Sequence, residues 1–326
     1  MKLFLFLVLL VLALFAASLL IGPAGLGLGE SLAALFRGEG GPVVLVMQEI
    51  RLPRAVLGLL AGAALGLSGA AMQGYLRNPL AEPGLIGVSG SAALGAVLAL
   101  QTGLAGVFAL ALPLSALAGA GLSVLLILAL AGPRGGALAL ILAGVALSAL
   151  SGALTSLVLN LSPNPFAAME IVYWMMGSLA DRSMAHVWLA GPFIVAGMAA
   201  LLSVGRGLDA LTLGEDAAQS MGVNLNRLRL VVIFGTAAAV GAAVAVAGAV
   251  GFVGLVVPHI LRPWVGARPS RLLPAAALGG AAMLLAADIA TRLIAPDRDL
   301  KLGVLTAIVG APFFLHLIWR LRRVEA

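Results

Sequence analysis

The sequence RLPRAVLGLLAGAALGLSGAAMQGYLRNPLAEPGLIGVSGSAALG, residues 51–95, decides the fold. No charged residue interrupts it between Ala55 and Gly74, and about 20 apolar residues in a helix span the hydrocarbon core of a bilayer. Glycine or alanine recurs at every fourth position from Gly58 to Gly74. Small side chains on one face let a second helix approach closely. The stretch therefore predicts a transmembrane helix packed tightly against a neighbour.

A polar break, RNPLAEPG at residues 77–84, follows this helix. Its two prolines lack backbone donors and restrict the residues before them, so the break cannot be the interior of a helix. Unpaired backbone groups are not tolerated in lipid. We therefore expect the break at a membrane surface or beside an aqueous path.

Composition places the whole chain in a membrane. Of its 326 residues 62% are hydrophobic and 10% charged, whereas soluble domains carry roughly 25% charge. The 19 Lys and Arg outnumber the 13 Asp and Glu, but they stand singly or in pairs between apolar runs, which does not suggest nucleic-acid binding. The absence of cysteine excludes disulfides and thiolate metal sites.

The apolar runs predict an all-α polytopic protein with about ten transmembrane helices in a single domain, residues 1–326. The expected spans are 3–21, 54–76, 85–101, 107–131, 138–159, 189–204, 230–250, 251–262, 273–294 and 303–319. The first run is too long for a signal-peptide core, so we expect it to be retained. The polar segment 22–49 is expected on the outer surface. The distribution of arginines favours cytoplasmic N- and C-termini.

Two segments suggest a weak internal repeat. The pattern GAA followed by GA occurs with identical spacing at residues 62–70 and 241–249. In the expected topology the two helices run in opposite directions, as in the inverted repeats of transporters.

Two further features bear on function. The polar interval 205–229 predicts a short helix over residues 215–221, a stop at Gly222 and a new helix start at Asn224; it is either a solvated loop or a docking element for a soluble partner. Asp288 and Arg292 are four residues apart in the outer half of a span. They form either a pair within the helix, or a site where Arg292 faces an outside partner.

Several segments together resemble a known family. They are IRLPR (50–54), GAALGLSGAAMQ (62–73), NPLAEPG (78–84), YWMMG (173–177), LGE (213–215) and GFVGLVVPHILR (251–262). The chain is similar to the permease subunits of type II ABC importers, the family for iron–siderophore, haem and cobalamin uptake.

The resemblance implies a ten-span fold like that of the family's cobalamin permeases. It implies a homodimer in the bacterial inner membrane, two cytoplasmic ATP-binding subunits, and a periplasmic or lipid-anchored substrate-binding protein. It implies no catalytic residue, cofactor or metal site in the permease itself.

The resemblance also assigns roles to residues. Arg51, Arg54 and Arg292 match outer arginines that pair with glutamates of the binding protein, and Asn78 and Leu80 match the inner gate. The residues that match the ATPase-docking helices are Gly214, Glu215, Asp216, Ala217, Met221 and Gly222. A second gate segment with hydroxyl side chains reads GGAL at residues 135–138 here. This departure favours a ferric siderophore as cargo, with cobalamin or haem next.

The expected function is thus a non-enzymatic importer permease. The chain has no GxxxxGK[ST] phosphate loop, so energy must come from a separate ATPase or an ion gradient. The alternative is therefore an ion-coupled secondary transporter that acts alone, for which Glu170 and Asp288 are the candidate acids. A structural or signalling membrane protein would not need the docking helices.

Overall fold

The structure, a computed structural model, describes residues 2–22, 25–36, 41–108, 110–132, 135–162, 165–295 and 300–325. Within these ranges it contains helices and no strand. The helices that correspond to predicted spans are α1 (Lys2–Leu20), α4 (Leu52–Tyr75), α5 (Val88–Gln101), α6 (Ala111–Ala131), α7 (Ala137–Asn160), α9 (Met184–Ser203), α12 (Leu225–Ala247), α13 (Val253–Leu261), α14 (Pro269–Ile294) and α15 (Leu302–Glu325). The shorter elements are α2 (Leu28–Phe36), α3 (Pro42–Leu45), the π-helical turn η1 (Val46–Arg51), η2 (Pro83–Ile86), η3 (Leu104–Gly106), α8 (Pro165–Met175), α10 (Gly205–Leu211), α11 (Glu215–Ser220) and η4 (Arg262–Val265).

The all-α polytopic prediction is confirmed. Among the described residues, 7 helices are long and apolar enough to cross a membrane. Shorter apolar helices lie at Val88–Gln101, Val253–Val265 and Leu302–His316, where the remaining predicted spans were expected. The protein is a multi-pass membrane protein.

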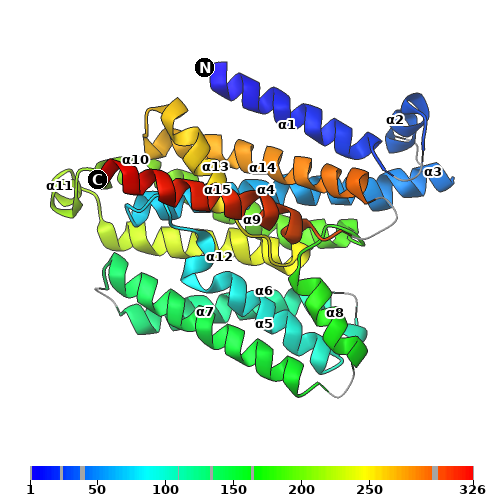
Figure 1. Cartoon of the computed structure of the whole chain (residues 1–326), viewed down its shortest axis with the longest axis horizontal. Helices are drawn as coiled ribbons and strands as arrows, with labels where there is room; N and C mark the ends of the chain where they lie inside the picture. The colour runs from blue at the N-terminus through cyan, green and yellow to red at the C-terminus, as the bar shows by residue number, and fades with distance from the viewer. Residues whose placement is uncertain are drawn as a thin grey trace.

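The long helices lie side by side, and most of the short helices lie at the two ends of the bundle (Figure 1). Both termini lie at the end that carries α10 and α11, which we call the inner end after the orientation expected from the sequence. Helices α2, α3 and α8 lie at the opposite, outer end. Ten spans, as predicted from the sequence, would place both termini on this common side.

The segment 22–49, which was expected on the outer surface, contains α2, α3 and most of η1 among its described residues. One span boundary differs from the prediction. The sixth span begins at Met184 rather than Leu189, because Ser183 and His186 form a capping box: the backbone N–H of Ser183 donates to Nδ1 of His186 at 3.2 Å. Such a cap lets a helix begin within a polar sequence.

The centre of the bundle is the pair formed by α4 and α14. A Cβ atom added at Gly62 would collide with the carbonyl oxygen of Gly280, and one added at Gly66 with the carbonyl oxygen of Ala276. The two backbones are therefore in direct contact, and the middle of α4 is buried on all sides. The close approach predicted from the small residues of α4 is confirmed.

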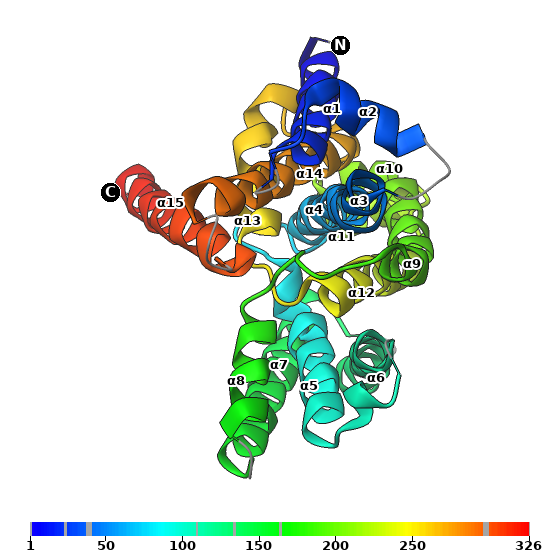
Figure 2. The ribbon, with the colours of Figure 1, turned by 90° about the vertical axis from the view of Figure 1, so that its right-hand side faces the viewer.

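A second group, α5 to α8, stands apart from this centre (Figure 2). Helices α5 and α6 also cross at glycines, since a Cβ atom at Gly95 or at Gly119 would meet backbone of the other helix. The group joins the rest of the bundle partly through Gly241 of α12, which faces Ala120 and Val88.

Helix α13 contains Pro258, which offers no N–H to the carbonyl oxygen of Gly254 one turn earlier. The buried side chain of Gln73 in α4 meets that need. Its Nε2 donates to the carbonyl oxygens of Gly254 at 3.3 Å and Leu255 at 3.4 Å, and its Oε1 accepts from Nη2 of Arg262 at 2.6 Å. One amide thereby joins α4 to both ends of α13.

The proposed repeat falls on α4 and α12, which run in opposite directions (Figure 1). Non-helical segments follow both helices, at residues 76–82 and 248–252. This arrangement is what an inverted repeat predicts, and the repeat itself stays a prediction.

Candidate functional site

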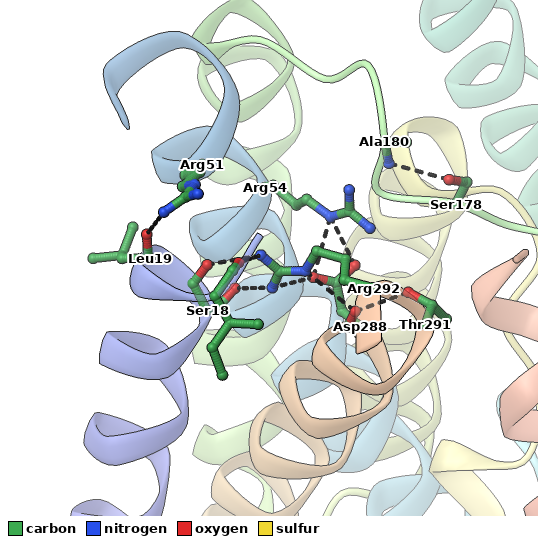
Figure 3. Close-up of polar contacts among 10 residues, drawn as sticks. Ser18, Leu19, Arg51, Arg54, Ser178, Ala180, Asp288, Thr291 and Arg292 are labelled. Atoms are coloured by element: carbon green, nitrogen blue, oxygen red, sulfur yellow. Dashed lines mark hydrogen bonds and ion pairs between the residues drawn. The ribbon is translucent and has the colours of Figure 1, made fainter. Parts of the chain in front are cut away.

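The first outer arginine, Arg51, lies inside the protein (Figure 3). Its side chain is buried, and Nη1 donates to the carbonyl oxygens of Leu19 and Leu20, each at 3.0 Å. These carbonyls belong to the last turn of α1, where no intrahelical donor is left. Arg51 therefore caps the C-terminus of α1.

Asp288 lies between the other two outer arginines (Figure 3). Its Oδ1 accepts from Nε of Arg54 at 2.9 Å, and its Oδ2 accepts from Nη2 of Arg292 at 2.8 Å. The carboxylate is almost fully buried, with 2% of its side chain exposed. The pairing of Asp288 with Arg292 within one helix is thus confirmed, while the bond to Arg54, 234 residues away in sequence, was not predicted.

Arg292 also reaches α1. Its Nη1 donates to the carbonyl oxygens of Ser18 at 2.8 Å and Ile21 at 2.6 Å. Arg51 and Arg292 together satisfy four carbonyls at the end of one helix, so both guanidinium groups are engaged within the chain. Only Arg54 keeps a partly exposed side chain, 18%, and its two Nη atoms make no hydrogen bond within the described part of the chain. A docking role for the three arginines stays a prediction, and Arg54 is best placed for it.

The gate residues Asn78 and Leu80 lie in the non-helical segment after α4. Oδ1 of Asn78 accepts from the backbone N–H of Leu80 at 2.9 Å, and Arg77 adopts a left-handed φ of 49°. The segment is held to the second break of the bundle, because Oε1 of Glu82 accepts from the backbone N–H of Phe252 at 2.8 Å. The predicted break is confirmed; a gating role is untested.

The docking residues form the predicted short helix. Gly214 (φ 109°) and Gly222 (φ 84°) bracket α11, and both adopt conformations that favour glycine. Glu215, Asp216 and Met221 are exposed, and Ala217 is half-buried. This exposed helix projects from the inner end (Figure 1) and suits contact with a soluble partner.

The gate and docking segments lie beside each other. Nη2 of Arg77 is 3.9 Å from Oε1 of Glu215, and both side chains are about half exposed. A polar cavity next to α11 is lined by Tyr75 of α4, Gly135 and Arg229 of α12. Arg229 donates to the carbonyl oxygen of Gly135 at 2.5 Å. Docking helices, gate segment and the α6–α7 connection therefore meet at one place.

Sequence reasoning missed Gln73, Arg54's bond to Asp288, and a carboxylate on α10, Asp209. Gln73 could have been found, since an amide amid apolar residues calls for a buried partner. The other contacts join residues far apart in sequence and left no local signal. Within the described ranges, no group of three or more His, Cys, Asp or Glu side chains could hold a metal ion.

Comparison with known proteins identifies the family. The profile of the FecCD transport family matches residues 9–320. The chain belongs to this family. The cobalamin import system permease protein BtuC of Halobacterium salinarum is 42% identical over 86% of this chain and 75% of its own length. The ferric dicitrate transport system permease protein FecD of Escherichia coli is 40% identical over 85% and 86%, respectively.

The fold of the FecCD family is also matched by a solved structure. A structure described as an inward-facing conformation of a metal-chelate type ABC transporter superposes with a TM-score of 0.87, at 34% identity, and covers 98% of this chain and 99% of its own. The resemblance to permease subunits of ABC importers is confirmed.

The buried carboxylate yields a first prediction. Asp288→Asn leaves the buried guanidinium group of Arg292 and the partly exposed one of Arg54 without a counter-charge, and breaking a buried ion pair costs about 3–5 kcal/mol. Glu215→Gln is the matched control, because its exposed pair with Arg77 is worth no more than about 1 kcal/mol. Thermal unfolding in detergent should show a large loss for Asp288→Asn and little change for Glu215→Gln. Equal stability of the two variants would contradict the role given to Asp288.

Proposed function

We propose that this chain is the membrane-spanning permease subunit of an ATP-binding-cassette importer that moves a bulky metal chelate into the cytoplasm. The observation that carries the proposal is the match to the FecCD transport family over residues 9–320. Relatives with 40–42% identity are named for cobalamin import and for ferric dicitrate transport. In this scheme the chain binds no nucleotide and catalyses no reaction.

A ferric siderophore is the cargo we propose first, with cobalamin or haem next. All three hold a metal within a large organic ligand. The α6–α7 connection supports the order, since residues 135–138 read GGAL and offer no hydroxyl group to a ligand. A second copy of the chain would complete the pathway, and the substrate-binding protein would supply most of the specificity.

We propose one kind of partner at each end of the bundle. The exposed helix α11 supports docking of one ATP-binding subunit per copy at the inner end, with residues 205–229 as the docking region. Arg54 supports docking of a periplasmic or lipid-anchored binding protein at the outer end. The exposed leucines of α7, such as Leu138 and Leu142, face lipid or the second copy. We place the protein in a bacterial inner membrane with both termini in the cytoplasm.

The ion-coupled alternative is disfavoured by its candidate acids. Asp288 is already bonded to two guanidinium groups, which leaves no free carboxylate for a coupling ion. Glu170 is exposed on α8 at the outer end. The two acids therefore do not form one buried site of the kind that secondary transporters use.

Uptake into liposomes tests the proposal. The chain is purified together with its ATP-binding subunits and inserted into liposomes. Labelled ferric siderophore or cyanocobalamin should cross the membrane only when ATP is present on the side of the ATP-binding subunits and the binding protein is present on the opposite side. A proton or sodium gradient should not replace ATP. Uptake by the chain alone, driven by such a gradient, would favour the secondary transporter.

Arg54 yields a prediction about the binding protein. Guanidinium groups pair with carboxylates in a fork geometry that amides lack. We expect Arg54→Gln to weaken association with the binding protein at least about tenfold, and added salt to weaken the parent complex. Lys301→Gln removes a charge from the same end and serves as the control. Titration in nanodiscs would contradict the role of Arg54 if the two variants bound alike.

A further inference from the structure

Asp209 of α10 holds the first turn of α14. Its Oδ1 accepts from the backbone N–H of Ser270 at 2.8 Å, and its Oδ2 accepts from Oγ of Ser270 at 2.6 Å. Ser270 is the second residue of α14, so its N–H has no partner within the helix. A carboxylate at this position also interacts favourably with the helix dipole. One side chain of the short helix α10 thus caps a membrane helix.

Helix α10 is built into the bundle, unlike α11. Leu208 is fully buried and lies near Gly74 at the inner end of α4. A Cβ atom added at Gly205 would lie 3.1 Å from Cα of Ser270, so α10 also meets the backbone of α14. In α11 only Ala218 is buried. A force applied to the exposed helix α11 can therefore reach the bundle through α10.

Helix α14 extends from this contact to the outer end. It has 26 residues, which corresponds to about 39 Å, and its outer part carries Asp288 and Arg292. Pro274 provides no N–H to the carbonyl oxygen of Ser270, so the helix's own hydrogen bonds hold its first turn weakly. The bidentate contact with Asp209 pairs the N–H and the hydroxyl group of Ser270 and ties this first turn to α10.

We propose that Asp209 is a positioning residue that couples the ATPase-docking helices to α14, so that movement of α11 on ATP binding reaches Asp288 and Arg292 at the outer end of α14. The inference rests on the proposed function, because it requires an ATP-binding subunit at α11. The movement would pass from α10 through Asp209 and Ser270 to α14 and its partner α4.

In the competing route, the movement of α11 would pass to the bundle through α12, which follows it in the chain. Oδ1 of Asn224 accepts from the backbone N–H of Arg227 at 2.9 Å and caps that helix. Asp209→Ala and Asn224→Ala therefore each remove one cap from a membrane helix beside the docking region. The pair forms a matched comparison, since each substitution removes a side-chain acceptor from the first turn of a membrane helix.

Spin labels can report the two ends of the route separately. The chain contains no cysteine, so Leu213→Cys reports the docking region and Leu293→Cys the outer end of α14; both side chains are exposed. Distances between labels on the two copies would be measured by pulsed electron paramagnetic resonance in the purified complex with its ATP-binding subunits, with and without ATP and vanadate. The parent chain should show a change at both positions.

With Asp209→Ala, the nucleotide-dependent change at Leu293 should be lost while that at Leu213 persists. Asn224→Ala should preserve both changes. Retention of the Leu293 change in Asp209→Ala, or an equal loss in Asn224→Ala, would overturn the proposed route. If Asp209→Ala does not assemble, Ser270→Ala removes the shorter of the two hydrogen bonds and should reduce the change at Leu293. An unaltered change in that variant would overturn the route as well. If the distance between the Leu213 labels in the parent chain did not change with ATP, the proposed function would be contradicted, and the inference with it.

Discussion

The backbones of α4 and α14 touch, and the rest of the bundle is arranged around that contact. Glycines at the crossing leave no room for side chains, so dispersion forces act between two main chains over several turns. Lipid offers no hydrophobic driving force between helices, which makes such close packing the main source of cohesion here. A carboxylate forms a contact at each end of this helix pair. At the outer end Asp288 of α14 bonds Arg54 of α4, and at the inner end Asp209 joins α10 to α14.

Polar side chains join the neighbouring helices to this pair. Arg51 and Arg292 satisfy the terminal carbonyls of α1, and Gln73 satisfies a carbonyl that Pro258 leaves open in α13. Each contact removes an unpaired backbone group that would be costly in a membrane. The few polar residues of the spans therefore act mainly between helices, and the outer arginines stabilise the fold whatever they bind outside it.

Local patterns predicted what local forces determine. The spans followed from runs of apolar residues, α11 from its bracketing glycines, and the Asp288–Arg292 pair from a spacing of four. Arg51 shows the limit: the family resemblance assigned it to docking at the outer surface, whereas its bonds to the open carbonyls of α1 form only in the folded chain and have no local signal. The contacts of Arg54 with Asp288 and of Asp209 with Ser270 likewise depend on helix packing, which no short segment encodes.

Thermal unfolding of two alanine variants in nanodiscs tests the central claim most directly. Alanine is favoured over glycine inside a helix by up to about 1 kcal/mol, so Gly121→Ala, where nothing lies within 4 Å of the added Cβ, should be neutral or stabilising. Gly66→Ala pushes a methyl group into the backbone of α14 and should cost about 1–3 kcal/mol. Equal or greater stability of Gly66→Ala would show that the contact between α4 and α14 does not hold the bundle together.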